Sequence, residues 1–269
     1  MILKMKHFVV FATICFSTSC TESSTWHIFD KKGSTHEMKT PATLEASQIR
    51  IGDTLEPAKE IEDFIAPYRK RVNEVLDSTL AFAPKTLTKD DGAYNSSAGN
   101  LLADIVRQEA DSVFVSRTDR HIDFVLLNHG GIRSIISKGP ISARSAYEVM
   151  PFENEVVVAK LSGFQVMELA VYLRDSGRAH PISGLQVVLD KDNEIASIKI
   201  QGRDLDKERN YYVATSDYLL NGGDNMVFFK DALDVEDLDY KVRNLLIDYF
   251  MKVDTVVAET DNRFIKLGK

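Results

Sequence analysis

The sequence predicts an α/β protein in which helices and mixed sheets form a layered sandwich around one core. Three observations lead to this prediction. Amphipathic helical segments alternate with short apolar runs, hydrophobic residues make up 44% of the 269 residues, and no internal repeat or low-complexity run breaks the pattern. A chain of this length can bury a substantial core as one domain.

Two helices are predicted in the first half of the chain. Between Pro57 and Leu80, apolar side chains recur three or four positions apart and define one helical face: Ile61, Phe64, Ile65, Tyr68, Val72, Val75 and Leu76. In the second helix, at about 97–112, the residues that share one side are Leu101, Leu102, Ile105 and Val106.

Strands and helices then alternate to the end of the chain. The predicted segments are strand 122–128, helix 142–148, strand 155–161, helix 163–174, and strand-like runs at 185–189, 195–200 and 210–215. A last helix is predicted from Asp237 to Met251, with an apolar stripe made of Leu238, Val242, Leu245, Leu246 and Phe250. We assign this domain to residues 47–269.

The first 19 residues are typical of an export signal. Lys4 and Lys6 precede an apolar run at 8–16, which is too short to span a bilayer and has the length of a signal-peptide core. Small residues directly before Cys20 resemble a bacterial lipoprotein cleavage site. We therefore expect lipidation of Cys20 and a lipid-anchored protein of the cell envelope, facing the periplasm or the cell surface. Ordinary signal cleavage nearby is the alternative.

Residues 20–46 are polar and lack sustained periodicity, so we expect a tether that ends in a short strand around 48–51. The net charge of −7 argues against a nucleic-acid partner, which would need a basic patch. An anionic ligand must then be attracted locally. Arg133 is the main candidate for this, with Lys138 and Arg144 as additional cations.

Two glycine-rich segments follow apolar strands. The first contains Asn128, Gly130, Gly131 and Arg133. Glycines at a strand end let a ligand approach the backbone, and the arginine fork suits phosphate or carboxylate. The second segment contains Tyr218, Asn221, Gly222, Gly223 and Asp224. Between them, the aromatic Phe152 directly follows a proline.

Each of these motifs also has a plainer interpretation. Asn-Gly-Gly-Asp is a common turn sequence, because Asn and Gly tolerate positive φ. A single arginine after a turn is usually a solvated charge, and Phe152 or Tyr218 could simply pack inward. What favours a ligand site is the occurrence of all three segments in one order at consistent separations.

Together, the three segments resemble the C-terminal, substrate-binding domain of the 5'-nucleotidase family, over about residues 61–250. The resemblance implies a layered helix–sheet–sheet–helix fold. It also implies that Asn128 and Arg133 contact a nucleotide, that Phe152 and Tyr218 clamp its base, and that Asp224 holds ribose hydroxyls. Stacking of a base on an aromatic ring is worth roughly 1–3 kcal/mol and tolerates different bases.

Two departures from the family pattern limit what the resemblance implies. Family members often carry an arginine and a glutamate ahead of the helix that begins near Gly99, where this chain has Asp-Gly-Ala-Tyr-Asn at 91–95. The second phosphate-binding arginine that the family pattern implies is therefore missing from this segment. None of the six histidines lies in the Gly-Asn-His or His-x-His clusters of the family's metallophosphatase domain. We expect no metal, cofactor or catalytic residue on this chain.

Two functions remain open at this point. The chain could be the nucleotide-binding half of a split 5'-nucleotidase or UDP-sugar hydrolase, with divalent metals held by a separate metallophosphatase chain. Alternatively, it could be a lipoprotein that binds nucleosides or nucleotides without a catalytic role. The residues do not distinguish a nucleoside monophosphate from a UDP-sugar or a cyclic nucleotide.

Overall fold

The computed structural model describes residues 47–48, 50–52 and 54–268. Cys20, the predicted signal and the tether at 20–46 lie outside the described residues. One compact unit extends from Ala58 to Lys269. At 48–51, the described residues are not in a strand. Within the part of the chain that the structure describes, no helix is long and apolar enough to cross a membrane.

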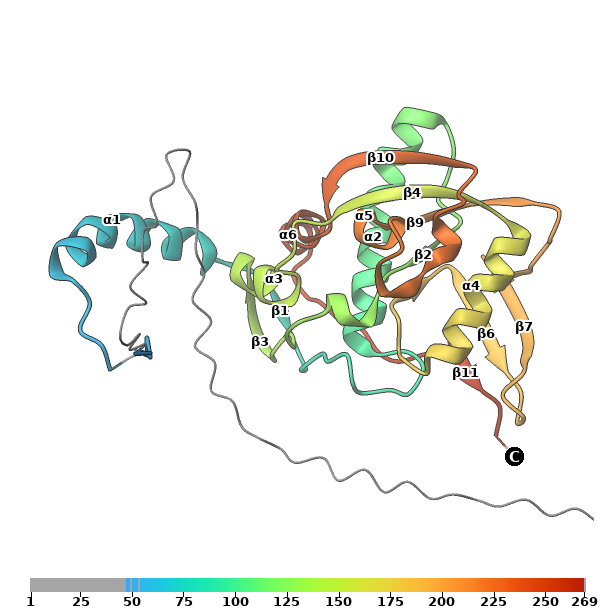
Figure 1. Cartoon of the computed structure of the whole chain (residues 1–269), viewed down its shortest axis with the longest axis horizontal. Helices are drawn as coiled ribbons and strands as arrows, with labels where there is room; N and C mark the ends of the chain where they lie inside the picture. The colour runs from blue at the N-terminus through green and yellow to red at the C-terminus, as the bar shows by residue number, and fades with distance from the viewer. Residues whose placement is uncertain (1–46, 49, 53, 269) are drawn as a thin grey trace, which may run out of the picture. The chain divides into compact units, whose positions relative to one another are not determined.

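A five-stranded mixed sheet forms the centre of this unit (Figure 1). Its strands, in spatial order, are β10 (Asp234–Lys241), β4 (Glu155–Ser162), β9 (Asn210–Ser216), β2 (Phe124–Leu126) and β5 (Ile182–Ser183). Strand β9 is antiparallel to β4 and parallel to β2. The carboxyl ends of β2 and β9 therefore lie at the same edge of the sheet, which is where the two glycine-rich segments begin.

The inner strands of the sheet contribute to a core cluster on each face, because successive side chains of a strand point to opposite sides. In β2, Val125 belongs to one core cluster, whereas Phe124 and Leu126 belong to the other. The helices α2 (Ser97–Thr118) and α6 (Val242–Lys252) cover the first face, and α3 (Ala143–Val149) packs beside α6 in the same core cluster. The second face packs against α4 (Gly163–Ser176) and a four-stranded sheet.

The remaining elements complete the layers. The four-stranded sheet has the order β11 (Phe264–Lys266), β6 (Leu185–Leu189), β7 (Ile195–Ile200) and β8 (Arg203–Asp204). A small pair joins β1 (Thr79–Ala83) to β3 (Gly139–Ser142). The other helices are α1 (Lys59–Leu76) and α5 (Asp217–Leu220), and the 3-10 turns are η1 (His129–Gly131), η2 (Gly223–Asn225) and η3 (Val227–Phe229). The predicted α/β class with mixed sheets is confirmed.

One predicted element is wrong at its start. The last helix was expected from Asp237, but residues up to Lys241 belong to β10, which pairs antiparallel with β4, and α6 begins only at Val242. The apolar spacing from Leu238 onward fits a helix, which explains the error. Pairing with the open edge of β4 decides the conformation instead, because edge hydrogen bonds are invisible to local periodicity.

Replacement of Leu126 by alanine tests the central position of β2. Leu126 is fully buried in the second core cluster, so Leu126→Ala should lower the free energy of unfolding by about 2–5 kcal/mol. Urea unfolding followed by circular dichroism measures this change. Val235→Ala, at an exposed position of β10, is the matched control and should change it by less than about 0.5 kcal/mol. Equal losses in both variants would contradict this packing.

Candidate functional site

The two glycine-rich segments meet through one hydrogen bond. After β2, Asn128 precedes the 3-10 turn η1, and its side-chain Nδ2 donates to Oδ2 of Asp224 at 2.7 Å. These residues are 96 positions apart in the sequence. The parallel pairing of β2 with β9 brings them together, because both segments leave the sheet at the same edge.

Gly131 is required by the position of the Asn128 side chain. A Cβ atom at residue 131 would lie 2.8 Å from Oδ1 of Asn128, which is closer than real Cβ contacts come. At Gly130 the nearest atoms are 3.5 and 3.6 Å away, on Asn128 and Asp224, so a methyl group would fit there at ordinary contact distance. The glycine at 131 thus keeps the asparagine directed at Asp224.

Asp224 is held by a second set of contacts. The Tyr218 hydroxyl donates to Oδ1 of Asp224 at 3.1 Å, and the Tyr172 hydroxyl donates to the Asp224 carbonyl at 2.9 Å. The Asp224 backbone has a φ of 50°, a strained region for a residue with a side chain. Gly223 allows this arrangement, because a Cβ atom there would lie 2.4 Å from the Tyr218 ring.

The other residues of the second segment shape the turn without lining the cavity described below. Asn221 directs its Nδ2 to the carbonyl of Asp217, at 2.8 Å, within α5. Gly222 has a φ of 85°, which glycine adopts readily, and a side chain there would collide with Lys230. Asn221, Gly222 and Gly223 therefore support Tyr218 and Asp224 in the structure.

Arg133 and Phe152 lie beside each other. The Arg133 guanidinium carbon is 5.6 Å from the centre of the Phe152 ring, a cation–π distance, and Nη1 donates to the carbonyl of Gly130 at 3.3 Å. The Phe152 and Tyr218 side chains remain 38% and 45% exposed. Neither ring is packed into the core, so both are available to a ligand.

Phe152 is positioned by a buried arginine on α6. Arg243 is almost fully buried, lies 4.1 Å from the centre of the Tyr147 ring, and donates to the Phe152 carbonyl at 3.1 Å. It also forms an ion pair with Glu153. Hydrogen bonds from Lys241 and Arg243 lower the pKa of Glu153 to about 2, so this carboxylate is charged throughout the physiological range.

A cavity of about 300 Å³ opens between these groups. It is lined by eight residues from all three predicted segments: Asn128, Gly130, Gly131, Arg133, Phe152, Asn154, Tyr218 and Asp224. Asn154 was not predicted as a site residue. Its position two residues after Phe152 is the sequence feature that could have identified it. Lys138 is not among the lining residues, and Arg144 pairs with Asp77 next to α1 instead.

His180 holds the η1 turn of the site by a hydrogen bond, and this role was not predicted from the sequence. Its Nδ1 accepts a hydrogen bond from the His129 backbone N–H at 3.3 Å, and its ring lies 5.5 Å from that of Tyr172. Burial lowers the pKa of His180 to about 4. The imidazole is therefore neutral near pH 7. Only a neutral imidazole has a ring nitrogen that can accept the hydrogen bond from the His129 N–H. A single histidine in the segment between α4 and β5 matches no sequence pattern that would predict this role.

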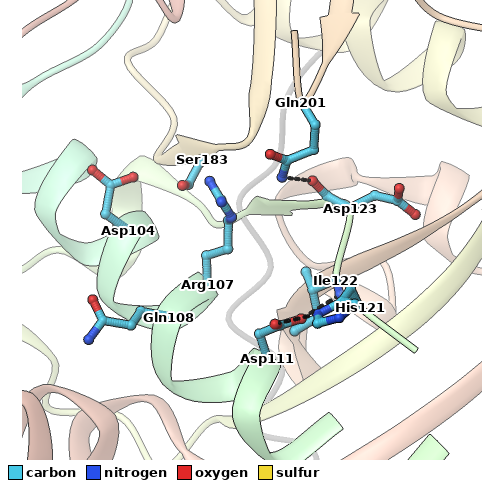
Figure 2. Close-up of a pocket in the computed structure, with 9 residues that line it drawn as sticks. All are labelled: Asp104, Arg107, Gln108, Asp111, His121, Ile122, Asp123, Ser183 and Gln201. Carbon is cyan, nitrogen blue, oxygen red and sulfur yellow. Dashed lines mark hydrogen bonds and ion pairs between the residues drawn. The ribbon is translucent and has the colours of Figure 1, made fainter. Parts of the chain in front are cut away.

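A larger cavity lies elsewhere and is lined by different kinds of side chain. It measures about 660 Å³ and is lined mainly by polar residues of α2 and of the segments before β2 and after β7 (Figure 2). Asp111 pairs with His121 at 2.9 Å, and burial raises the pKa of Asp123. Three carboxylates (Asp104, Asp111 and Asp123) accompany a single arginine, which disfavours a phosphate ligand.

No metal-ligand cluster accompanies the 300 Å³ cavity. Among the described residues, no group of three or more histidine, cysteine, aspartate or glutamate side chains is close enough to hold a metal ion. What the cavity offers is an arginine, two aromatic rings and a carboxylate, which can bind and orient a ligand.

Comparison with known proteins identifies the family. The model of the 5'-nucleotidase C-terminal domain matches residues 79–231, which is more than half of the chain. The chain belongs to this family. Similar proteins include the trifunctional nucleotide phosphoesterase protein YfkN of Bacillus subtilis, 25% identical over 86% of this chain and 16% of its own length. Protein UshA of Escherichia coli is 35% identical over 38% of this chain and 19% of its own length.

A solved structure supports the fold. The 5'-nucleotidase precursor of Thermus thermophilus superimposes with a TM-score of 0.63 at 24% identity, covering 78% of this chain and 44% of that protein. The cell wall protein Lmo0130 of Listeria monocytogenes is 27% identical over 68% of this chain and 26% of its own length. This chain thus spans less than half of the length of each of these relatives.

The low pKa of His180 predicts a pH-dependent stability. An unfolded histidine binds a proton near pH 6.5, whereas folded His180 stays neutral down to about pH 4. Below pH 6.5 the unfolded state binds more protons, so stability should fall as the pH drops from about 6.5 to 4, by roughly 3 kcal/mol.

Urea unfolding at a series of pH values measures this change. His180→Gln provides the comparison, because glutamine retains an acceptor for the His129 N–H but does not titrate. Its stability should fall less over the same range. Curves with the same slope for both proteins would contradict the assignment of the titration to His180.

Proposed function

We propose that this chain binds a nucleotide in the 300 Å³ cavity, as the nucleotide-binding half of an exported phosphohydrolase of the 5'-nucleotidase or UDP-sugar hydrolase type. One observation carries the proposal. Two partly exposed aromatic rings, Phe152 and Tyr218, line the same small cavity as a cation, Arg133, and a carboxylate, Asp224. These are the groups that a base, a phosphate and a ribose require.

Each group has a physical role in this proposal. The base stacks on Phe152 and Tyr218, which gains roughly 1–3 kcal/mol per ring contact. The Asp224 carboxylate keeps free lone pairs beside its bonds to Asn128 and Tyr218, and these accept the ribose hydroxyls. The Arg133 guanidinium lies next to Phe152 and donates to the phosphate.

The hydrolytic step is assigned to another chain. Because the described residues provide no metal-ligand cluster, we infer that divalent metals are held by a separate metallophosphatase chain, where they would activate the attacking water. The contribution of this chain is then orientation: it fixes the base and ribose so that the phosphate meets the metals in one geometry.

A second function is favoured by one feature of the cavity. Among the described residues that line it, Arg133 is the one cation, and Arg144 is engaged with Asp77. A single cation fits a nucleoside nearly as well as a nucleotide. The alternative is therefore a lipoprotein that captures nucleosides or nucleotides without a catalytic role.

The cell envelope is the proposed location. Lmo0130 is named a cell wall protein, and the sequence before Cys20 resembles a lipoprotein cleavage site. We infer that a lipid on Cys20 anchors the chain to the membrane. Metabolic labelling with a radioactive fatty acid should mark the wild type and fail in Cys20→Ser; label that persists in the variant would refute the anchor.

Calorimetric titration with AMP tests the aromatic contacts. Phe152→Ala and Tyr218→Ala should each weaken binding by roughly 1–3 kcal/mol, because each removes one stacking surface. Phe164→Ala is a matched control, since Phe164 is an exposed phenylalanine on α4 that does not line the cavity. If AMP binds equally well to all four proteins, the cavity is not the nucleotide site.

Comparison of AMP with adenosine separates the two functions. A nucleotide site should prefer AMP, and Arg133→Ala should remove that preference, because a hydrogen bond to a charged group is worth about 1.5–3 kcal/mol. Arg178→Ala, at an exposed arginine outside the cavity lining, is the control. Equal affinity for both ligands would support the nucleoside-capture alternative and rule out phosphate positioning.

Recovery of the partner tests the split arrangement. The chain purified from membranes under mild conditions should bring with it a metallophosphatase, and the mixture should hydrolyse AMP in the presence of divalent metal. Tyr218→Ala should lower that activity by about 10-fold or more, in line with one lost stacking contact. Membranes that yield no such partner would contradict the arrangement.

A further inference from the structure

Helix α1 presents an apolar face that the described residues leave uncovered. None of its residues is buried, although the sequence pattern defines a clear stripe. Five apolar side chains are each between 53% and 68% exposed: Ile61, Phe64, Tyr68, Val72 and Val75. A contiguous row of large exposed side chains is unusual on a soluble domain and marks an interaction surface.

The stripe is continuous along the whole helix. At 100° per residue, the seven apolar side chains between Ile61 and Leu76 fall within about 120° of the helix circumference. The rings of Phe64 and Tyr68 lie 5.8 Å apart within this row. In Figure 1 the end of α1 meets the rest of the unit beside α3, where Arg144 binds Asn73 and Asp77.

Charges border the stripe in a regular arrangement. On one side lie Glu62 and Arg69, which form an ion pair within the helix. On the opposite side of the stripe, the helical projection places Glu60 and Arg71. On both sides, the acidic residue is in the first half of the helix and the basic residue is in the second half.

This arrangement has a twofold symmetry. The point midway between Ile65 and Ala66 is equally far in sequence from Glu60 and Arg71, and also from Glu62 and Arg69. An antiparallel copy of the helix, related by a dyad at this point, would place each glutamate opposite an arginine on both sides of the stripe. Such flanking pairs set orientation and partner choice in helix pairs.

We propose that α1 pairs antiparallel with α1 of a second copy of this chain, so that the apolar side chains from Ile61 to Tyr68 of the two helices pack together and the two sets of charges meet. The occupant is a second copy because the charge pattern is complementary to itself. Antiparallel packing also places opposite helix ends beside each other, which is favourable for the two macrodipoles.

The charge balance of α1 argues against a membrane surface as the occupant. Helices that lie on anionic membranes are rich in lysine and arginine on the polar face. Here the two signs are equal in number: Lys59, Arg69, Lys70 and Arg71 against Glu60, Glu62, Asp63 and Glu74. A neutral polar face with ordered flanking pairs fits a protein partner better.

Sedimentation equilibrium of the purified full chain tests the proposal. The wild type should form a dimer at concentrations of tens of micromolar or below. Phe64→Glu should raise the dissociation constant by about 30-fold or more, because loss of a buried aromatic anchor costs at least about 2 kcal/mol at an interface. Since Phe64 is exposed in the single chain, this change should leave folding intact, which circular dichroism verifies.

Val257→Glu is the matched control. Val257 is exposed to a similar extent but lies outside α1, so this variant should dimerise as the wild type does. A wild type that stays monomeric at 100 micromolar and above, or a dimer that Phe64→Glu leaves unchanged, would overturn the proposal.

Crosslinking tests the antiparallel register. In a background with Cys15 and Cys20 changed to serine, Ile65→Cys places two thiols about 1.5 Å apart along the helix axis, and Val75→Cys places them about 28 Å apart. A short bismaleimide should therefore link Ile65→Cys and not Val75→Cys. A parallel pair would link both variants, and that result would overturn the register.

Discussion

The hydrogen bond from Asn128 to Asp224 is the interaction on which the candidate site depends. It joins two loops that the sequence places 96 residues apart, and it exists because β2 and β9 are parallel neighbours in the central sheet. Without it, no side-chain hydrogen bond would join Asn128 to the Asp224 carboxylate, and the two loops would be held only by separate contacts such as those of Tyr172 and His180. With this hydrogen bond in place, the Arg133 guanidinium and the Asp224 carboxylate both line one cavity.

The residues around this hydrogen bond allow few other side chains at the neighbouring positions. A side chain at Gly131 would collide with Asn128, and one at Gly223 would collide with the Tyr218 ring. Two buried polar side chains hold the backbone on either side of the cavity. His180 accepts a hydrogen bond from the His129 N–H in η1, and Arg243 donates one to the Phe152 carbonyl. Because these supports are buried, the loops can keep two aromatic rings exposed without losing their conformation, which is the preorganisation a binding site needs.

The sequence predicted the groups that carry local chemical signals. Glycines, an arginine and aromatics after strands marked most of the cavity lining, and periodicity placed most helices and strands. It could not show which side chains reach the cavity: Asn221 and Gly222 shape the turn, while Asn154 lines the space. Supports such as His180 act through contacts distant in sequence. The error at Asp237 has the same origin, since pairing with β4 overrides a helical spacing.

A crystal structure of the chain soaked with AMP at millimolar concentration tests the binding site most directly. We expect density in the 300 Å³ cavity, with the base against Phe152 and Tyr218, the ribose hydroxyls on Asp224 and the phosphate at Arg133. An empty cavity, or nucleotide bound in the polar cavity beside Arg107 instead, would contradict this expectation.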